Sequence, residues 1–331
     1  MAMLAAVGAV LLVAAACGGG DDEVLTIYAG RSQNLVQPLL EQFAKDTGVH
    51  IRVKYGDSTD LALGILEEGK NSPADVYYAQ DIGALGALKA AGRLQPLSEA
   101  TLNQVPAAFR SPDGQWVGVS GRARVIVYNT DDVDPKSLPS SILDYTDSKW
   151  RGQIAIVPRS DGFPEFVTAL RLLKGEEFAR TWLRALKANE PKTYPNNLAA
   201  IQAVANGEVK VAFLNHYYVY RFLEEEGQGF KARNSYFGGG DLGGLFLVSG
   251  AAILDTSKHR EAAERFINYL LTQSSQQYFA EQTFEYPLVA GVPTDPGLPP
   301  LASMKPPEID LSNLTDLQGS LALMRDTGIL P

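Results

Sequence analysis

Cysteine and histidine are scarce in this sequence of 331 residues, which holds one cysteine and three histidines. A single cysteine excludes a disulfide within the chain. Neither paired cysteines nor an H-E-x-x-H motif provides zinc ligands at the usual spacing. No Gly-x-Ser-x-Gly elbow stands in a context that suits a nucleophilic serine. Because no activated nucleophile or acid–base pair is recognisable, we expect the protein not to be an enzyme.

Basic residues and long apolar runs are lacking as well. The chain has 29 Lys and Arg against 38 Asp and Glu, a net charge of −9. This balance is unsuited to nucleic acid or to an anionic membrane surface, so we expect no nucleic-acid partner. The most apolar stretch, residues 3–16, is shorter than the roughly 20 residues that span a bilayer. Its length is typical of the apolar region of a signal peptide.

The only cysteine, Cys17, follows three alanines and precedes a Gly-Gly-Gly-Asp-Asp stretch. This order resembles a bacterial lipobox, in which the leader is cleaved before the cysteine and the cysteine is acylated. It predicts a signal peptide over residues 1–16, lipidation of Cys17 and a flexible linker over residues 17–23. The protein would then lie outside the cytoplasm, lipid-anchored to the outer face of the cell membrane or periplasmic. A free cysteine in an ordinary signal peptide is the alternative.

Strand-like and helix-like segments alternate over the rest of the chain. Predicted strands, rich in β-formers, cover residues 24–29, 50–55, 75–78, 124–128, 153–157, 210–214 and 249–254. Predicted helices, with apolar residues at helical spacing, cover residues 34–46, 61–68, 82–91, 176–187, 197–205 and 258–271. Such repetition implies parallel strands with right-handed crossovers. It predicts two α/β lobes joined by strands near residues 121–128 and 245–254, with an irregular proline-rich segment at 287–307.

A cleft between the lobes is the expected ligand site, since open α/β sheets bind ligands beyond the carboxyl ends of their strands. The segment 215–218, which ends in Tyr217 and Tyr218, directly follows the predicted strand 210–214. On composition alone, packing at a helix start explains this pair better than ligand binding does. Arg31, Arg122 and Arg124 lie at a strand end or on a predicted crossover. Each guanidinium could hold an oxyanion or form a structural ion pair, and both alternatives stay open.

Seven stretches, taken together and in order, resemble the ferric-ion-binding proteins, which are the extracellular solute-binding components of ABC iron(III) importers. They are residues 27–32, 68–76, 120–128, 203–208, 215–218, 249–252 and 285–288. The resemblance implies an α/β, two-lobed periplasmic-binding-protein-like fold of type II. Each lobe would be a mixed, mostly parallel sheet flanked by helices, and two crossover strands would join the lobes. Lobe 1 would comprise residues 24–122 and 249–300, and lobe 2 residues 123–248 and 301–331.

The resemblance also implies metal ligands. Tyr217 and Tyr218 match the successive tyrosines that give phenolate oxygens to iron(III) in that family. Gln80, with Asp81 beside it, stands where some members have a carboxylate ligand. Two phenolates leave a trivalent ion with a charge of +1, so we expect an exogenous anion to complete the site, with or without Asp81. Tyr28 is a further candidate phenolate.

The anion in this expectation is carbonate or phosphate. Residues that match the family's anion-binding loops are Ser160, Gly162, Asn197 and Asn215, to which we add Arg31, Ser32 and Arg122. Ser32 occupies the position of a histidine ligand in some members, and Phe163 lies in the loop from which others supply a further tyrosine. Both departures leave the metal with fewer protein ligands and strengthen the case for an anion.

The expected function is capture of iron(III) with a synergistic anion and its delivery, by a monomer, to the membrane subunits of an ABC permease. Fold does not determine function. The alternatives are a receptor of the same fold for an oxyanion, a thiamine-like cation or a polyamine, and a ligand sensor for a signalling partner.

Overall fold

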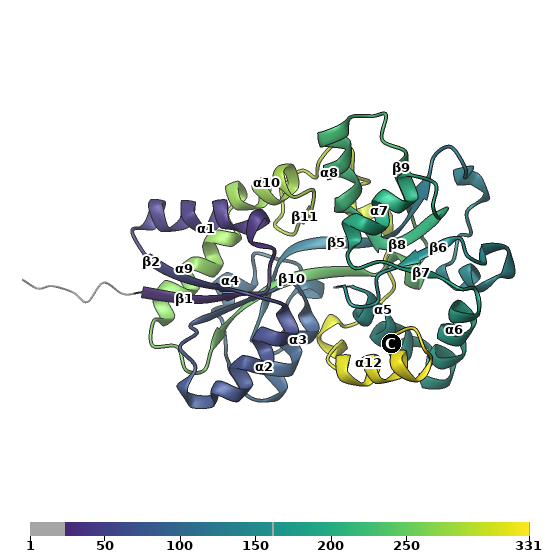
Figure 1. The fold of residues 1–331 in the computed structure, drawn as a ribbon. Helices are drawn as coiled ribbons and strands as arrows, with labels where there is room; N and C mark the ends of the chain where they lie inside the picture. The colour runs from purple at the N-terminus through teal and green to yellow at the C-terminus, as the bar shows by residue number, and fades with distance from the viewer. Residues whose placement is uncertain (1–23, 161, 331) are drawn as a thin grey trace, which may run out of the picture.

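The computed structural model describes residues 24–160 and 162–330. The predicted signal peptide, linker and Cys17 lie outside the described residues. Figure 1 shows two α/β lobes side by side, with the long strands β5 (Val117–Asn129) and β10 (Phe246–Leu254) running between them. The prediction of a two-lobed α/β fold with two crossover strands is confirmed.

The first lobe contains the N-terminal elements. Its sheet places β2 (His50–Tyr55), β1 (Val24–Ala29) and β3 (Val76–Ala79) side by side in parallel. β10 joins the other edge of β3 in the antiparallel sense and pairs with β5 in turn. The other helices and strands of this lobe are α1 (Gln33–Thr47), α2 (Ser58–Glu68), α3 (Ile82–Ala90), β4 (Leu94–Gln95), α4 (Glu99–Leu102), α9 (Arg260–Leu270), α10 (Gln273–Gln282) and β11 (Tyr286–Pro287).

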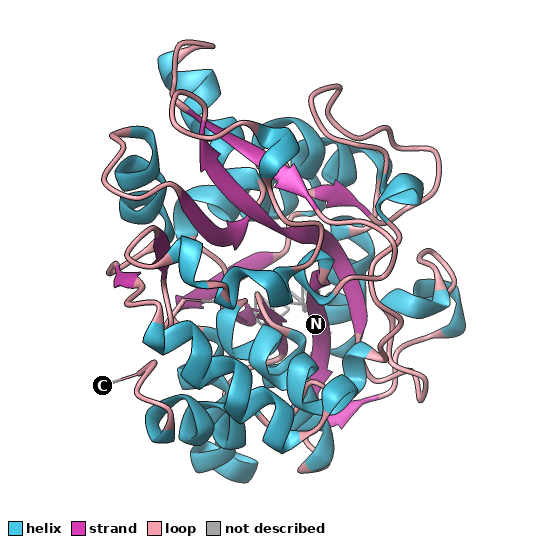
Figure 2. Cartoon of the chain, turned by 90° about the vertical axis from the view of Figure 1, so that its right-hand side faces the viewer, coloured by secondary structure: helices cyan, strands magenta, loops and turns pink. Residues whose placement is uncertain are grey.

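The second lobe repeats the plan. β7 (Lys192–Thr193), β6 (Ile154–Ile156) and β8 (Val211–Asn215) are parallel neighbours, and β5 pairs antiparallel with β8 and with β9 (Ala232–Tyr236). Its helices are α5 (Phe163–Lys174), α6 (Glu176–Ala188), α7 (Asn197–Ala205), α8 (Tyr217–Glu226) and α12 (Leu317–Asp326). Figure 2 shows the helices packed on the faces of the strands.

β5 belongs to both sheets. Residues Val117 to Ala123 pair with β10, whereas residues from Arg124 onward pair with β8 and β9. The sheet-to-sheet boundary therefore falls between Ala123 and Arg124. Asn215, the last residue of β8, pairs with Arg124 at this boundary. The carboxyl end of β8 thus points to the junction of the lobes, as the sequence analysis expected for a ligand site.

Several elements were not predicted. α5 begins at Phe163 and Pro164, behind Gly162 at a φ of 101°. Proline suits a first helical turn because its missing N–H has no partner there, and glycine alone adopts such a φ without strain. α10 and α12 were also missed. The segment 287–307 is irregular, as predicted, apart from α11 (Leu301–Met304) and the end of β11.

The C-terminal segment packs against both lobes. Its 3-10 turn, Leu311–Asn313, lies against α3, and α12 lies against α5. A Cβ at Gly83 would stand 2.6 Å from the carbonyl oxygen of Leu314, and one at Gly86 would stand 2.3 Å from the methyl of Thr315. Two glycines one helical turn apart therefore allow this close approach. Over the described residues, no helix has the length and apolar character needed to cross a membrane.

Candidate functional site

The tyrosine pair begins α8 directly beyond the end of β8. The ring centroids of Tyr217 and Tyr218 are 4.2 Å apart at an interplanar angle of 39°. Tyr217 is buried and Tyr218 is half-buried. Both occupy the first turn of the helix, where the helix dipole favours negative charge.

Charged groups from the first lobe act on Tyr217. Burial raises its pKa well above the usual 10, and the neighbouring Tyr218 raises it further. The guanidinium of Arg122 acts in the opposite direction, whereas the carboxylate of Glu285 adds to the rise. Tyr217 is therefore a neutral phenol at neutral pH without a metal. A bound cation would have to displace its proton.

Arg124, one of the three arginines that the sequence analysis offers as possible oxyanion ligands, lies beside both tyrosines. It donates to Asn215 Oδ1 at 2.9 Å and to the Phe213 carbonyl at 2.8 Å, and it lies 4.2 Å above the Phe213 ring. Burial lowers the pKa of Arg124 to about 9, against the opposing effects of Glu165 and the two tyrosines. Arg122 and Arg124 stand two residues apart on one strand, so the sequence alone places their side chains on the same face.

Two buried donors at this place have no partner among the described residues: Arg124 Nε and Asn215 Nδ2. An unpaired buried donor costs about 1–3 kcal/mol, so native proteins usually satisfy such groups. Gly162 lies against them, since a Cβ there would stand 2.9 Å from Arg124 Nη1 and 3.1 Å from Asn215 Oδ1. The structure therefore brings Gly162 and Asn215 together, as expected for anion-binding residues.

Ser160 and Asn197 form a second contact. Ser160 Oγ donates to Asn197 Oδ1 at 3.2 Å and to the Val157 carbonyl at 3.1 Å. Asn197 is the first residue of α7, whose N-cap is Asn196. The two residues are thus side by side at a helix N-terminus, which is a favourable place for an anion.

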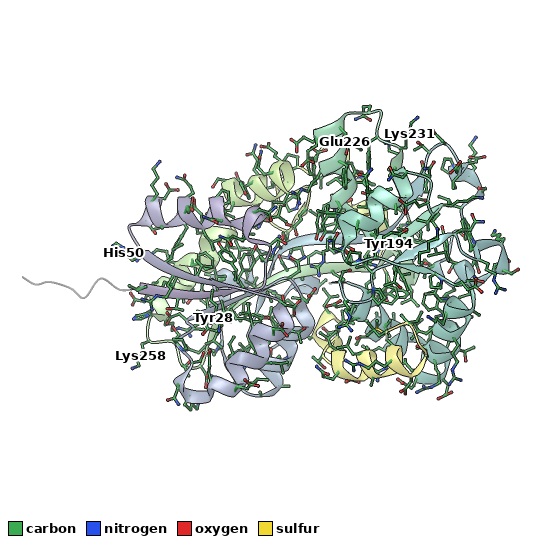
Figure 3. All side chains as sticks on the ribbon, viewed as in Figure 1. Tyr28, His50, Tyr194, Glu226, Lys231 and Lys258 are labelled. Carbon is green, nitrogen blue, oxygen red and sulfur yellow. The ribbon has the colours of Figure 1, made fainter. Side chains whose placement is uncertain are left out.

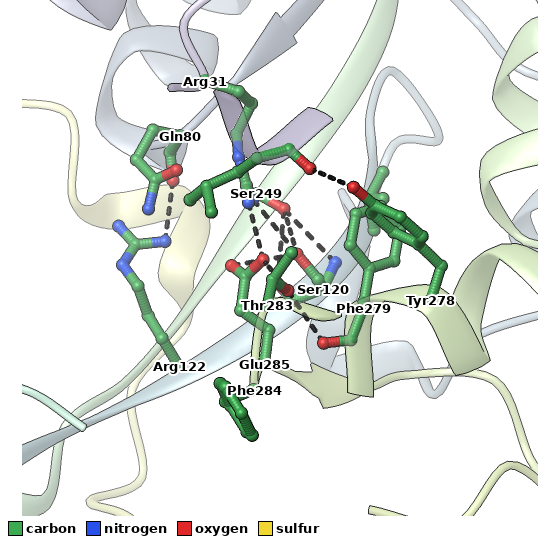
Figure 4. Close-up of polar contacts among 12 residues, drawn as sticks. Arg31, Gln80, Ser120, Arg122, Ser249, Tyr278, Phe279, Thr283, Phe284 and Glu285 are labelled. Atoms are coloured by element: carbon green, nitrogen blue, oxygen red, sulfur yellow. Dashed lines mark hydrogen bonds and ion pairs between the residues drawn. The ribbon is translucent and has the colours of Figure 1, made fainter. Parts of the chain in front are cut away.

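Arg31 is held in a buried ion pair. Its guanidinium donates to Glu285 at 2.6 Å and to Ser120 Oγ at 3.1 Å, and both partners of the ion pair are 1% exposed. Thr283 and Ser120 also donate to the same carboxylate. Figure 4 shows this network. Of the two alternatives left open for Arg31, the structure shows the ion pair. Ser32, the next residue, is exposed and makes no side-chain capping bond to α1.

Arg122 is held in the same manner. It pairs with Asp81, and its second terminal nitrogen donates to the Gln80 carbonyl at 2.8 Å (Figure 4). Arg122 and Asp81 are 1% and 3% exposed. The carboxylate of Asp81 is therefore already balanced by a guanidinium. Gln80 itself is buried.

Tyr28 is not brought together with the tyrosine pair. Its hydroxyl donates to Glu68 at 2.8 Å, and Lys54 lies 4.4 Å above its ring. Burial, with the Glu68 contact, raises the pKa of Tyr28 to about 12. Figure 3 places Tyr28 within the first lobe, away from α8. Its phenol is thus engaged elsewhere.

Residues of both lobes line one pocket of about 200 Å³. Asp57 and Asp81 come from the first lobe, Ser160 and Glu165 from the second, and Arg325 from α12. Two predicted site residues, Asp81 and Ser160, therefore face a common space between the lobes. Within residues 24–160 and 162–330, no group of three or more His, Cys, Asp or Glu side chains is placed to hold a metal ion. A metal here would need other donors, such as phenolates.

Comparison with known proteins identifies the family. The model of a family described as bacterial extracellular solute-binding protein matches residues 71–313. The chain belongs to this solute-binding family. Among relatives of this solute-binding protein is the major ferric iron-binding protein of Neisseria meningitidis, 35% identical over 311 residues, which are 92% of this chain and 93% of the relative.

Solved structures agree with this assignment. Iron-bound HitA from Pseudomonas aeruginosa has a TM-score of 0.88 and 38% identity, and the match covers 92% of this chain and 99% of HitA. A Trichodesmium protein (IdiA, FutA) in complex with iron and citrate has a TM-score of 0.80 and 33% identity, with the same coverage of both chains. Both are solute-binding proteins of this two-lobed architecture that were solved with iron bound.

Proposed function

We propose that this solute-binding protein captures iron(III) between its lobes, with Tyr217 and Tyr218 as phenolate ligands and a small anion as a further ligand. One observation carries the proposal: two adjacent tyrosines in contact begin a helix at the lobe junction, beside buried donors that have no partner among the described residues. The relatives that are named or solved as iron-binding proteins support the same cargo.

The chemistry of the donors favours iron(III). A trivalent ion is a hard acid, and phenolate is a hard anionic oxygen donor. The cation supplies the energy that removes the phenol proton, which the protein alone does not remove because burial opposes ionisation of Tyr217. Binding should therefore release protons.

The charge balance explains the need for an anion. Asp81 is neutralised by Arg122, and Glu285 by Arg31. Two phenolates then leave the iron centre at +1. Arg124 Nε and Asn215 Nδ2 are the donors best placed to hold an anion against it, with Ser160, Gly162 and Asn197 nearby in the loops of the second lobe. Carbonate or phosphate is the anion in this proposal.

The proposed transport step is a closing of the two lobes. The lobes, residues 24–122 with 249–300 and residues 123–248 with 301–331, would close by bending of the crossover strands near Ala123, and the closed monomer would dock on an ABC permease. We also propose that Cys17 carries a lipid that keeps the protein at the outer face of the membrane. The C-terminal segment, which touches α3 as well as α5, would limit the closing motion.

An iron(III) titration of the purified protein tests the proposal. Ferric nitrilotriacetate is added with and without bicarbonate or phosphate, and the visible phenolate-to-iron charge-transfer band is recorded. Tyr217→Phe and Tyr218→Phe should each lower the affinity by roughly a thousandfold. Tyr220→Phe is the matched control, because Tyr220 lies on the same helix and its hydroxyl contacts Tyr236 and the Gly297 carbonyl. A colourless native protein, or full colour in both phenylalanine variants, would refute the iron site.

A further inference from the structure

We propose that His216 is a positioning residue that fixes the tyrosine pair against the first lobe. The inference rests on the proposed function, because it concerns how the same site holds and releases iron. His216 stands between Asn215 and Tyr217 and is fully buried. It is the residue immediately before α8, so any movement of its ring is passed directly to Tyr217.

Two hydrogen bonds determine the state of the imidazole. The backbone N–H of Ala123 donates to Nδ1 at 3.2 Å, so Nδ1 carries no proton. Nε2 lies 2.8 Å from the carbonyl oxygen of Phe284. A carbonyl oxygen only accepts, so Nε2 must carry the proton and donate it. The ring is therefore neutral, in one tautomer, with both nitrogens used.

Both hydrogen-bond partners belong to the first-lobe side of the lobe boundary, whereas α8 belongs to the second lobe. Ala123 is the last residue of β5 that pairs with β10, directly before the point where β5 enters the second sheet. Phe284 precedes β11, which pairs with the first-lobe part of β5. His216 thus connects the second-lobe helix to a hinge strand through Nδ1 and to the first lobe through Nε2.

The acceptor at Phe284 is itself held firmly. Phe284 has a φ of 55°, an unusual value for a residue with a side chain. The next residue, Glu285, forms the buried ion pair with Arg31, and Thr283 bonds to the same carboxylate. The Phe284 carbonyl is therefore anchored by neighbours on both sides. A contiguous series of contacts runs from Arg31 through Glu285, Phe284 and His216 to Tyr217.

Aromatic packing adds to the connection. The His216 ring centroid lies 5.0 Å from that of Tyr286 in β11 and 5.7 Å, edge-on, from that of Tyr217. The imidazole thus separates a first-lobe ring from a metal-ligand ring. Losing the bond from Nε2 to Phe284 should let α8 move relative to the first lobe and should speed the release of iron.

Two substitutions of His216 each remove one of the two hydrogen bonds of the imidazole and keep the other. In His216→Asn the side-chain oxygen can replace Nδ1 as acceptor for Ala123, but the side chain is too short to reach Phe284. In His216→Gln the terminal amide can replace Nε2 as donor to Phe284, and the acceptor for Ala123 is lost. Each variant loses one buried hydrogen bond, so a merely structural role predicts equal effects for both. His259→Asn, at the start of α9 in the first lobe, is the control.

Release of iron to excess chelator is followed by stopped-flow decay of the charge-transfer band. We expect His216→Asn to release iron roughly tenfold faster than native protein, the order expected for one lost buried hydrogen bond, with a shifted band. His216→Gln should stay within about threefold of native, and His259→Asn should match it. Equal release rates in the asparagine and glutamine variants would overturn the inference.

An iron-free measurement separates this inference from the proposed function. Hydrogen exchange of the peptide covering residues 217–226 should be faster in His216→Asn than in His216→Gln, with the control unchanged. If the native protein fails to bind iron, the proposed function fails, and exchange still decides whether His216 ties α8 to the first lobe. If the native protein binds iron and both variants exchange alike, only the inference fails.

Discussion

The two sides of the lobe junction, called here the first-lobe wall and the second-lobe wall, differ in how their charged groups are balanced. The first-lobe wall (Arg31, Glu285, Arg122 and Asp81) consists of two buried ion pairs with further hydrogen bonds, and among the described residues only Arg31 Nε of the Arg31–Glu285 pair has no partner. The second-lobe wall (Tyr217, Tyr218, Asn215, Arg124 and Gly162) presents a tyrosine pair and two unpaired donors.

This difference implies that the first-lobe wall contributes to the stability of the fold and the second-lobe wall to the binding of a ligand. Buried charges that are paired with each other hold the fold together and offer a ligand little, because a ligand would first have to break the pair. Unpaired donors and neutral phenols weaken the free protein slightly and become satisfied when a ligand arrives. Substitutions in the first-lobe wall should therefore change folding more than binding, and those in the second-lobe wall the reverse.

The largest expected effect is on stability. Asp81→Asn leaves the Arg122 guanidinium buried without a compensating charge, so the free energy of unfolding should fall by about 3–5 kcal/mol. Iron affinity should change less than roughly threefold, since Asp81 is not a ligand in this account. Chemical denaturation and the ferric titration measure the two quantities. Tyr218→Phe should show the opposite pattern, and a large loss of iron colour in Asp81→Asn would make Asp81 a ligand.

The next effect concerns pH. The pKa of Tyr217 in the metal-free protein lies well above 10, so its phenol is protonated from pH 5 to 8 and ionised only when iron binds. The bound state thus holds fewer protons, and affinity must rise with pH. Loss of the Tyr217 proton alone gives a rise of about 10-fold per pH unit. The protons released on binding are measured in weakly buffered solution, and a ferric nitrilotriacetate blank is subtracted. The number released should be lower by about one in Tyr217→Phe. An affinity independent of pH would contradict phenolate ligation.

The smallest expected effect is on the stability of two Gly→Ala variants in neighbouring helices. Gly83→Ala in α3 would place a methyl 2.6 Å from the Leu314 carbonyl, so either the C-terminal segment or α3 must shift. We expect a loss of about 1–3 kcal/mol in the free energy of unfolding. Gly64→Ala in α2 meets no atom within 4 Å and should stabilise by about 0.5–1 kcal/mol. Equal thermal shifts in the two variants would show that the segment does not depend on this close approach.

The alternation of strands and helices could be predicted from the sequence because period-2 and helical apolar patterns are local properties. α7 has the predicted limits, 197–205, and β1 and β2 also agree with prediction. The crossover strands were found because each contains a run of β-forming residues, Val125–Tyr128 in β5 and Phe246–Val248 in β10.

The partners of the charged residues could not be predicted. Arg31 and Glu285 are 254 positions apart, and Arg122 and Asp81 are 41 positions apart. No local pattern reports such pairs, so the same arginines fitted an ion pair and an anion site equally well. Tyr217 and Tyr218 were singled out by family resemblance rather than by spacing. The burial of His216, and the lack of a partner for Asn215 Nδ2 among the described residues, depend on tertiary packing alone.

The place of β10 in the first sheet has a consequence for the order of folding. This strand lies between β3 and β5, yet it comes from residues 246–254. The first lobe therefore lacks a central strand until three-quarters of the chain has been made, and closing it requires a loop of more than a hundred residues. Such distant pairing slows folding. A fragment ending after β5 should remain without a stable first lobe, and the whole chain should stay open to chaperones or a translocation channel for longer than a protein built from local contacts.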